Sequence, residues 1–167
     1  MPSQYRIEIL TKDHDVKRFD CGDEGINRFL REDAIKQQEQ KYLSTYVTVN
    51  GRDVGTYATV ANGVVELTDV EKEDFPDFPY PQIPALLLAR LGRDIRYKGS
   101  GLGEIMIKFC IGLAHDVSEK VGCRVVCVHS YVGKAAYYES LGFVQCGGEQ
   151  EASGKLRYVT LYFDLKG

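Results

Sequence analysis

Arg96-Tyr97-Lys98-Gly99-Ser100-Gly101-Leu102-Gly103 is the stretch of this sequence that decides the fold. It lies between an apolar, strand-like segment over residues 83–93 and an amphipathic pattern that predicts a helix over residues 102–121. Glycines at alternate positions allow the backbone to pass close to a ligand and to adopt φ values that other residues resist. A helix that begins there offers unpaired N–H groups and the positive end of its dipole, which bind phosphate oxygens. The stretch therefore predicts a pyrophosphate-binding loop at a strand–loop–helix junction, with a purely structural turn as the alternative.

The kind of phosphate loop is narrowed by the residues after the glycines. A P-loop needs Gly-Lys-Ser/Thr at the helix start, whereas this sequence has Gly103-Glu104. A dinucleotide fingerprint needs glycine or alanine as its last member, and counting from Gly99 that position is Glu104. The remaining pattern is Arg96-x-x-Gly99-x-Gly101. It resembles the coenzyme A pyrophosphate loop of the GNAT acetyltransferases.

Size and composition predict one soluble domain over residues 1–167. The apolar runs are too short for a membrane span, and the first residues lack the apolar core of a signal peptide. The cysteines are an odd number, 5, without a CxxC pair, which argues against a disulfide framework or a zinc site. The histidines have no metal-ligand spacing. We therefore expect a cytoplasmic protein without a metal.

Charge is distributed unevenly along the chain. The net charge of −3 argues against a general nucleic-acid-binding protein, because such proteins usually carry a strong basic excess. Basic residues nevertheless gather beside the glycine loop, at Arg90, Arg93, Arg96 and Lys98. We interpret them as a positive mouth for an anionic cofactor, the alternative being a solvated edge.

The first half of the chain reads as a strand, a helix and a hairpin. Residues 5–10 alternate as a strand does, and residues 20–23 carry helix-start side chains before an apolar stripe that runs to about residue 40. Residues 43–49 and 54–60 are rich in strand formers and flank Asn50-Gly51, a strong hairpin signal. An acidic, proline-rich surface loop follows over residues 69–82, and its aromatics Phe75, Phe78 and Tyr80 are expected to turn inward.

The second half reads as a βαβ unit followed by a short helix and a hairpin. The unbroken apolar run at residues 86–88 predicts a central strand covered on both faces. After the glycine loop and its helix, residues 125–128 predict a second buried strand, parallel to the first. A helix over residues 134–140 is expected to end at Gly142 in the left-handed conformation. Residues 143–146 and 158–165 predict an antiparallel pair, with Gly147-Gly148 and Gly154 in the turn.

A second motif strengthens the resemblance. Tyr137-Tyr138-Glu139-Ser140-Leu141-Gly142-Phe143 resembles the Tyr-Glu-x-x-Gly-Phe signature that closes the cofactor half of GNAT enzymes. The order of elements also matches, over roughly residues 5–165. The resemblance implies an α/β (α+β) GNAT fold, with a mixed central sheet of about six to seven strands flanked by about four helices.

Two further segments of the sequence resemble those of the toxin-type GNAT branch. Phe19-Asp20-Cys21-Gly22 opens a helix with Asn27-x-x-Leu30, and residues 83–91 precede the cofactor loop as in that branch. Its members acetylate the amino acid on charged tRNA, and many pair with a repressor-like antitoxin. The acidic balance of this chain is a departure, because such toxins are usually basic.

The resemblance implies acetyl-CoA as cofactor and direct attack by an amine within a ternary complex. Tyr138 is implied as the general acid for the leaving thiolate, since a phenol pKa of about 10 suits that proton transfer; the alternative is a core tyrosine with a wet hydroxyl. The implied cofactor-binding residues, main chain included, are Leu91, Gly92, Arg93, Arg96, Tyr97, Lys98, Gly99, Ser100, Gly101, Leu102 and Gly103. Many family members have asparagine where this chain has Tyr131, which puts that contact in doubt. A general base is not evident: Glu66, Asp69 and Glu71 are interpreted as surface charge.

Several acceptors and partners stay open at this point. The leading hypothesis is an N-acetyltransferase acting on a primary amine of a small molecule or macromolecule. The alternatives are a toxin that acetylates aminoacyl-tRNA and a non-catalytic acyl-CoA-binding module. An antitoxin and a homodimer are conceivable partners, and a membrane is not expected. The helical segment over residues 23–40 could form a partner surface, although packing on the sheet is the simpler expectation.

Overall fold

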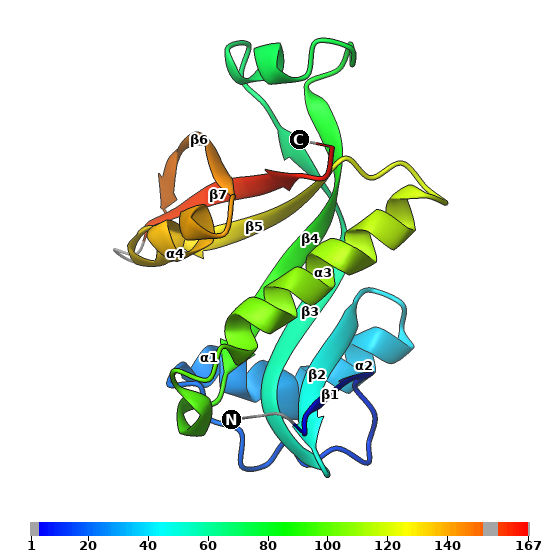
Figure 1. Ribbon diagram of the computed structural model, residues 1–167, viewed down its shortest axis with the longest axis vertical. Helices are drawn as coiled ribbons and strands as arrows, with labels where there is room; N and C mark the ends of the chain where they lie inside the picture. The colour runs from blue at the N-terminus through cyan, green and yellow to red at the C-terminus, as the bar shows by residue number, and fades with distance from the viewer. Residues whose placement is uncertain (1–3, 152–156, 167) are drawn as a thin grey trace. The chain divides into compact units, whose positions relative to one another are not determined.

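A computed structural model of the chain describes residues 4–151 and 157–166. Its strands form one mixed sheet in the order β1-β2-β3-β4-β5-β7-β6 (Figure 1). The strands are β1 (Arg6–Ile9), β2 (Ser44–Asn50), β3 (Asp53–Glu66), β4 (Gln82–Arg93), β5 (Val125–Tyr131), β6 (Val144–Glu151) and β7 (Arg157–Asp164). The α-helices are α1 (Glu24–Arg28), α2 (Ala34–Glu39), α3 (Leu102–Ser118) and α4 (Ala135–Ser140). The mixed sheet and the order of elements confirm the predicted fold class.

The chain divides into two compact units, which we describe separately. The first comprises Met1–Ala61 and Ala89–Cys110. In it, β1 pairs antiparallel with β2, and β2 pairs antiparallel with β3 across the turn at Gly51, whose φ is 65°. Helix α2 packs against β2 (Figure 1).

The core of the first unit explains why the α1–α2 segment is helical. One cluster of buried side chains joins residues of that segment to residues of β2 and β3 and of the connection before α1: Leu10, Phe19, Phe29, Leu30, Ala34, Val47, Val49, Val54 and Tyr57. Asp23 caps α1 by accepting hydrogen bonds from the main-chain N–H of Gly25 and Ile26. Packing on the sheet, the simpler expectation for residues 23–40, is therefore confirmed.

One irregularity in this segment was not predicted. A π-helical turn, Phe29–Asp33, separates α1 from α2, whereas the apolar stripe predicted a single helix. A π turn inserts an extra residue into the helix, and the period of apolar residues continues on both sides of it. The sequence pattern therefore cannot distinguish it from a regular helix.

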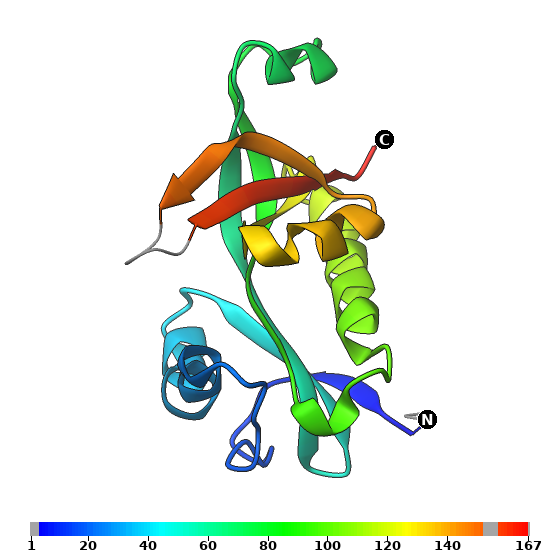
Figure 2. The same cartoon turned by 90° about the vertical axis from the view of Figure 1, so that its left-hand side faces the viewer.

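The second unit comprises Asn62–Leu88 and Ile111–Gly167. In it, β4 runs parallel to β5, with Ala85–Leu88 opposite Val125–Val128, which confirms the parallel pair. β5 and β6 both pair antiparallel with β7, and α4 lies beside β7 (Figure 2). Part of the core of this unit is a cluster of buried side chains from β3, β4, β5, β6, β7 and the acidic loop: Val65, Leu67, Phe75, Ile83, Ala85, Val125, Cys127, Cys146 and Tyr162.

The hairpin of the second unit corrects one prediction. Gly147 and Gly148 lie inside β6, not in its turn, and the register with β7 shifts between Cys146 and Gln150. Gly147 has a φ of 68°, which fits a glycine at a bulge. Gly154, the other glycine predicted for the turn, lies outside the described residues.

The acidic loop was predicted only in part. Phe75 is buried in the core of the second unit as expected, and Phe78 packs against that core. Tyr80 is 61% exposed, so its expected inward position is wrong; its ring packs edge-on against Phe78 instead. A 3-10 turn, Glu71–Asp74, shapes the loop, and the Glu71 carboxylate accepts hydrogen bonds from the main-chain N–H of Thr68 and Gly147.

Across the residues that the structure describes, each helix is too short or too polar to cross a membrane. Within the same ranges, no group of three or more histidine, cysteine, aspartate or glutamate side chains is arranged to hold a metal ion.

Candidate active site

The glycine loop joins a 3-10 turn, Ile95–Tyr97, to the first residue of α3. Gly99 and Gly101 have φ angles of 77° and 82°, the left-handed region that glycine adopts without strain. An added Cβ at either position would meet no heavy atom within 4 Å, so both face open space. Gly103 is a helical residue of α3. The loop thus places two exposed backbone turns directly before the N-terminus of a 17-residue helix, which is an arrangement that binds anions.

The loop is anchored at its entrance by Asp94. The Asp94 side chain is buried, and its carboxylate accepts hydrogen bonds from the main-chain N–H of Arg96 at 2.8 Å and of Asp20 at 3.2 Å. Its own N–H donates to the carbonyl of Gly55 at 2.8 Å. Burial alone would raise the pKa of Asp94, but the hydrogen bonds from Arg96 and Asp20 outweigh it and lower that pKa. Asp94 is therefore ionised at neutral pH, and it ties the loop to β3 and to the segment before α1.

The guanidinium of Arg96 is paired with two carboxylates of the protein itself. Its Nε and Nη2 donate to the two oxygens of Asp94, each at 2.9 Å, and Nη2 also donates to Asp53 Oδ1 at 3.1 Å. The other oxygen of Asp53 accepts from the Tyr97 hydroxyl at 2.9 Å. The hydrogen bonds to Asp94 and Asp53 raise the pKa of Arg96 further. Two carboxylates thus hold the guanidinium, and phosphate binding through this side chain stays a prediction.

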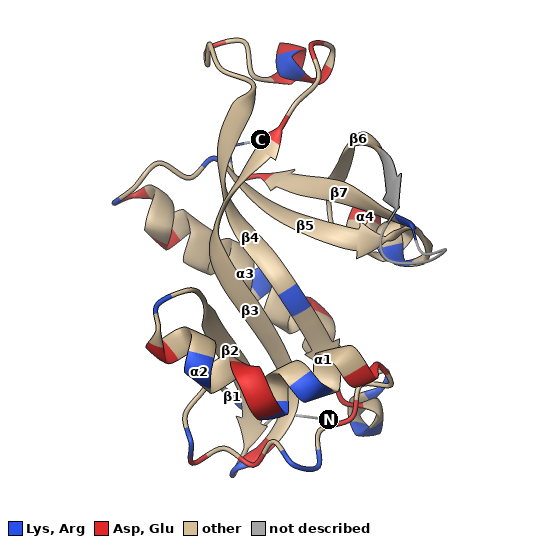
Figure 3. Ribbon diagram, turned by 180° about the vertical axis from the view of Figure 1, so that it is seen from behind, with Lys and Arg blue, Asp and Glu red and all other residues tan. Residues whose placement is uncertain are grey.

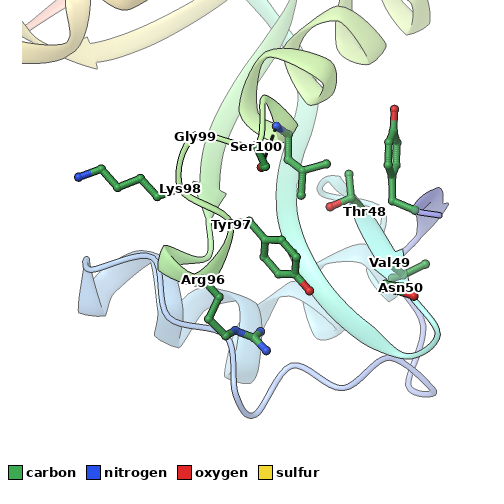
Figure 4. A pocket seen from close by; sticks show the side chains of 11 residues that line it. Thr48, Val49, Asn50, Arg96, Tyr97, Lys98, Gly99 and Ser100 are labelled. Carbon is green, nitrogen blue, oxygen red and sulfur yellow. Dashed lines mark hydrogen bonds between the residues drawn. The ribbon is translucent and has the colours of Figure 1, made fainter. Parts of the chain in front are cut away.

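Lys98 differs from Arg96 in this respect. Within the described part of the chain it makes no ion pair, and its side chain is exposed. Figure 4 shows it extending to the opposite side of the loop from the Tyr97 ring. Lys98 is therefore the loop cation whose charge is available to a ligand.

A cavity of about 500 Å³ lies under the loop (Figure 4). It is lined by Tyr5, Thr48, Val49, Asn50, Gly55, Arg96, Tyr97, Lys98, Gly99, Ser100 and Leu102. The Thr48 hydroxyl is buried and has no hydrogen-bond partner among the described residues. A Cβ at Gly55 would lie 3.1 Å from Leu102 Cδ1 and 3.3 Å from Thr48 Oγ1, so that glycine keeps the cavity open. The lining residues from β2 and β3 carry no local motif, and sequence reasoning missed them because strand pairing alone brings them to the loop.

The end of β4 holds the other predicted cofactor residues. Leu91, Gly92 and Arg93 follow the four residues of β4 that pair with β5, so their main-chain groups on that side are not used by that pairing. Nε of Arg93 is buried and has no partner among the described residues. A buried donor without an acceptor costs free energy, and a bound acceptor would satisfy it. This orphaned donor, the open glycine turns and Lys98 fit an anionic ligand rich in hydrogen-bond acceptors, as coenzyme A is.

Tyr138 belongs to the second unit. It lies on α4, is 7% exposed, and packs edge-on against Phe143 and Tyr137, with ring centroids 5.6 and 5.5 Å away. Its carbonyl accepts from the N–H of Phe143 at 3.1 Å, and Gly142 has a φ of 97°, which confirms the left-handed helix end. Tyr137 is 43% exposed, so the two neighbouring rings have different surroundings. The ring of Tyr138 is held in a fixed place, while its role as proton donor stays a prediction.

The acidic residues considered as a general base are on the surface. Glu66 and Asp69 are exposed. Burial would raise the pKa of Glu71, but hydrogen bonds from Thr68 and Gly147 outweigh it and lower that pKa. Because its oxygens are occupied by those N–H groups, Glu71 has a structural task in the loop.

Comparison with known proteins places this geometry in a family. No protein-family model matches the sequence. A tRNA-acetylating toxin of Mycobacterium tuberculosis is 32% identical over 131 residues, 77% of this chain and 78% of the relative. The solved structure of AtaT complexed with acetyl-methionyl-tRNAfMet has a TM-score of 0.84 and 30% identity, covering 97% of this chain and 95% of that one.

A further structure has the cofactor in place. It contains a tyrosine-to-phenylalanine mutant of the toxin AtaT bound to the C-terminus of its antitoxin AtaR and to acetyl-CoA. Its TM-score is 0.77 at 28% identity, and it covers 98% of this chain and 94% of that one. Identity at this level over most of both chains, together with the glycine loop and the matching sheet, establishes the family of the protein. The chain belongs to the family of GNAT acetyltransferase toxins, and it is an acetyltransferase that uses acetyl-CoA.

Proposed function

We propose that this enzyme acetylates the amino group of aminoacyl-tRNA. The observation that carries the proposal is the likeness, over nearly the full length of both chains, to AtaT complexed with an acetylated aminoacyl-tRNA. The relative from M. tuberculosis, named for tRNA acetylation, supports it independently. The order of the two hypotheses drawn from the sequence is thereby reversed: charged tRNA moves ahead of an unspecified primary amine.

The residues of the chain divide the chemistry between them. Acetyl-CoA supplies the acetyl group as an activated thioester. The main chain of Leu91–Arg93 binds the ligand arm and polarises the carbonyl under attack, as oxyanion donors do. The open turns at Gly99 and Gly101, the N-terminus of α3 and Lys98 hold the pyrophosphate. The Tyr138 hydroxyl gives its proton to the departing sulfur, and the acceptor amine loses a proton to water.

The acidic net charge of −3 favours a second candidate, an amine on a small molecule or protein. A chain that binds RNA through phosphates is usually basic. The two candidates share the cofactor and the proposed role of Tyr138, and they differ only in acceptor. A partner antitoxin and residence in the cytoplasm accompany the first candidate, and a homodimer remains a prediction for either.

The test is acetyl transfer to charged tRNA, followed by mass spectrometry of the released aminoacyl group. Tyr138→Phe is expected to lower kcat by about 10²–10⁴-fold, the usual contribution of a positioned general acid. Tyr137→Phe is the matched control, because it removes a neighbouring hydroxyl from an exposed ring, and it should retain activity. Turnover only on small or protein amines would refute the tRNA proposal. Equal activity of both variants would refute the role of Tyr138.

A further inference from the structure

Arg90, on β4, has an unusual environment for an arginine. Its guanidinium carbon lies 3.8 Å from the centre of the Phe29 ring. Phe29 is buried, and Arg90 is half-buried beside it. A guanidinium in this position is attracted to the ring face and stacks on it. The stack fixes the plane of the guanidinium and leaves its N–H donors around the edge of that plane.

The ring under Arg90 is itself rigidly held. Phe29 stacks on Tyr57, with centroids 6.4 Å apart and planes at 22°, and Tyr57 meets Phe19 edge-on at 5.4 Å. The hydroxyl of fully buried Tyr57 donates to the carbonyl of Ile26 at 2.7 Å. Phe29 also begins the π-helical turn, and such turns occur frequently at functional sites. The aromatic support is therefore in place before any ligand binds.

Within the described part of the protein, no carboxylate forms an ion pair with Arg90. Arg96 and Arg124, by contrast, are paired with aspartates. The Asp23 carboxylate, in the helical segment that contains Phe29, accepts hydrogen bonds from two main-chain N–H groups at the start of α1. A half-buried guanidinium that is held in a fixed plane and has no carboxylate partner is suited to bidentate binding of an oxyanion.

The position of Arg90 links it to the acceptor. It precedes Gly92 by two residues on one strand, a separation of about 7 Å at the usual rise of a strand. The segment from residue 89 to residue 103 has four basic residues and one acidic residue, and part of β4 is blue, for lysine or arginine, in Figure 3. In aminoacyl-tRNA the reacting amine is attached through an ester to the terminal ribose, so the phosphodiester of that nucleotide must lie close to the transfer site.

We propose that Arg90, stacked on Phe29, binds a phosphodiester at the 3′ end of the RNA acceptor and so positions the amine for transfer. This inference rests on the proposed function, because it requires an RNA acceptor. It adds the residue through which an acidic chain recognises that acceptor. Arg90 thus acts on the acceptor, while the glycine loop and Lys98 act on the cofactor.

The experiment compares Arg90→Gln and Arg90→Lys with the wild type and with Arg18→Gln. Arg18 is a matched control because it is exposed and forms no ion pair within the described part of the chain. Binding of an uncharged acceptor-stem RNA is measured over a series of salt concentrations, acetyl-CoA binding is measured by calorimetry, and kcat and KM are measured with charged tRNA. Thermal unfolding confirms that each variant is folded.

Arg90→Gln is expected to weaken RNA binding about tenfold or more, since a charged hydrogen-bonded contact is lost. The slope of log affinity against log salt should become shallower by about 0.7–0.9, the value for one phosphate contact. KM for charged tRNA should rise, and acetyl-CoA affinity should not change. Arg90→Lys should keep the salt slope but recover only part of the affinity, because it lacks the bidentate fork.

Several results would overturn the inference. RNA affinity and salt slope equal to those of Arg18→Gln would show that Arg90 does not touch phosphate. A loss of acetyl-CoA affinity with RNA binding retained would assign Arg90 to the cofactor. Should Arg90→Gln fail to fold, full recovery of affinity by Arg90→Lys would equally contradict a bidentate, stacked contact. Failure of the proposed function is distinct, because the wild type would then acetylate no charged tRNA.

Discussion

Gly92→Ala is predicted to destabilise the first unit by overpacking. A Cβ at this position would lie 2.8 Å from Ile26 Cγ2, 3.2 Å from Tyr57 Cε1 and 3.3 Å from Phe19 Cζ, whereas ordinary contact begins at 3.4 Å. The branched Ile26 side chain and the two packed rings cannot easily withdraw. Overpacking of this kind costs about 1–3 kcal/mol. For a chain of this size each kcal/mol lowers Tm by roughly 2–4 °C, so we expect Tm to fall by roughly 2–12 °C.

The assay is urea and thermal unfolding followed by circular dichroism. Gly112→Ala is the control, since Gly112 lies inside α3 with no atom within 4 Å of an added Cβ. It should stabilise the protein by about 0.5–1 kcal/mol through helix propensity. Combining Gly92→Ala with Ile26→Ala should cost less than the sum of the single changes, because the shortest contact is removed. Gly92→Ala with wild-type stability, or strict additivity in the double variant, would refute the packing argument.

Three further predictions concern the loop, acid stability and the thiols. Gly101→Ala should cost about 1–2 kcal/mol because its φ of 82° disfavours a Cβ even in open space, and calorimetry should show weaker acetyl-CoA binding; unchanged values of both would contradict it. Folding lowers the pKa of Asp94, so its contribution to stability is full above about pH 4 and is lost as pH falls further; urea midpoints of Asp94→Asn should depend less on pH in that range, and a curve parallel to wild type would exclude this contribution. Burial raises the pKa of the thiols of Cys110 and Cys127 to about 12 and that of Cys146 to about 11, so a disulfide reagent should label them only after unfolding, and rapid labelling of the native protein would disprove their burial.

Local patterns predicted the elements that carry the cofactor loop. The apolar run before residue 94, the glycines at 99 and 101 and the amphipathic period of α3 are all encoded within a short window. Glycine at positions 99 and 101 permits the positive φ that the structure shows there. The hairpin at Gly51 was predictable for the same reason.

Contacts between distant segments were not predictable. Arg96 looked like a ligand for phosphate, but Asp53, which lies 43 residues earlier, shares its guanidinium with Asp94. The bulge at Gly147 was mistaken for a turn because both use glycine at positive φ. Thr48 lines the cavity because β2 pairs with β3. The residues around Thr48 in the sequence give no sign of this position.

The hydrogen bonds of Asp94 determine which part of the loop backbone is already ordered before a ligand binds. The carboxylate holds the main-chain N–H of Arg96 and of Asp20, so folding already fixes the backbone that enters the loop. Ordering the backbone of one residue costs about 1–2 kcal/mol of conformational entropy. Because this entropy is already lost when the protein folds, it does not reduce the free energy of coenzyme binding. Association should then proceed at the rate of docking to a rigid surface, without a slow ordering step.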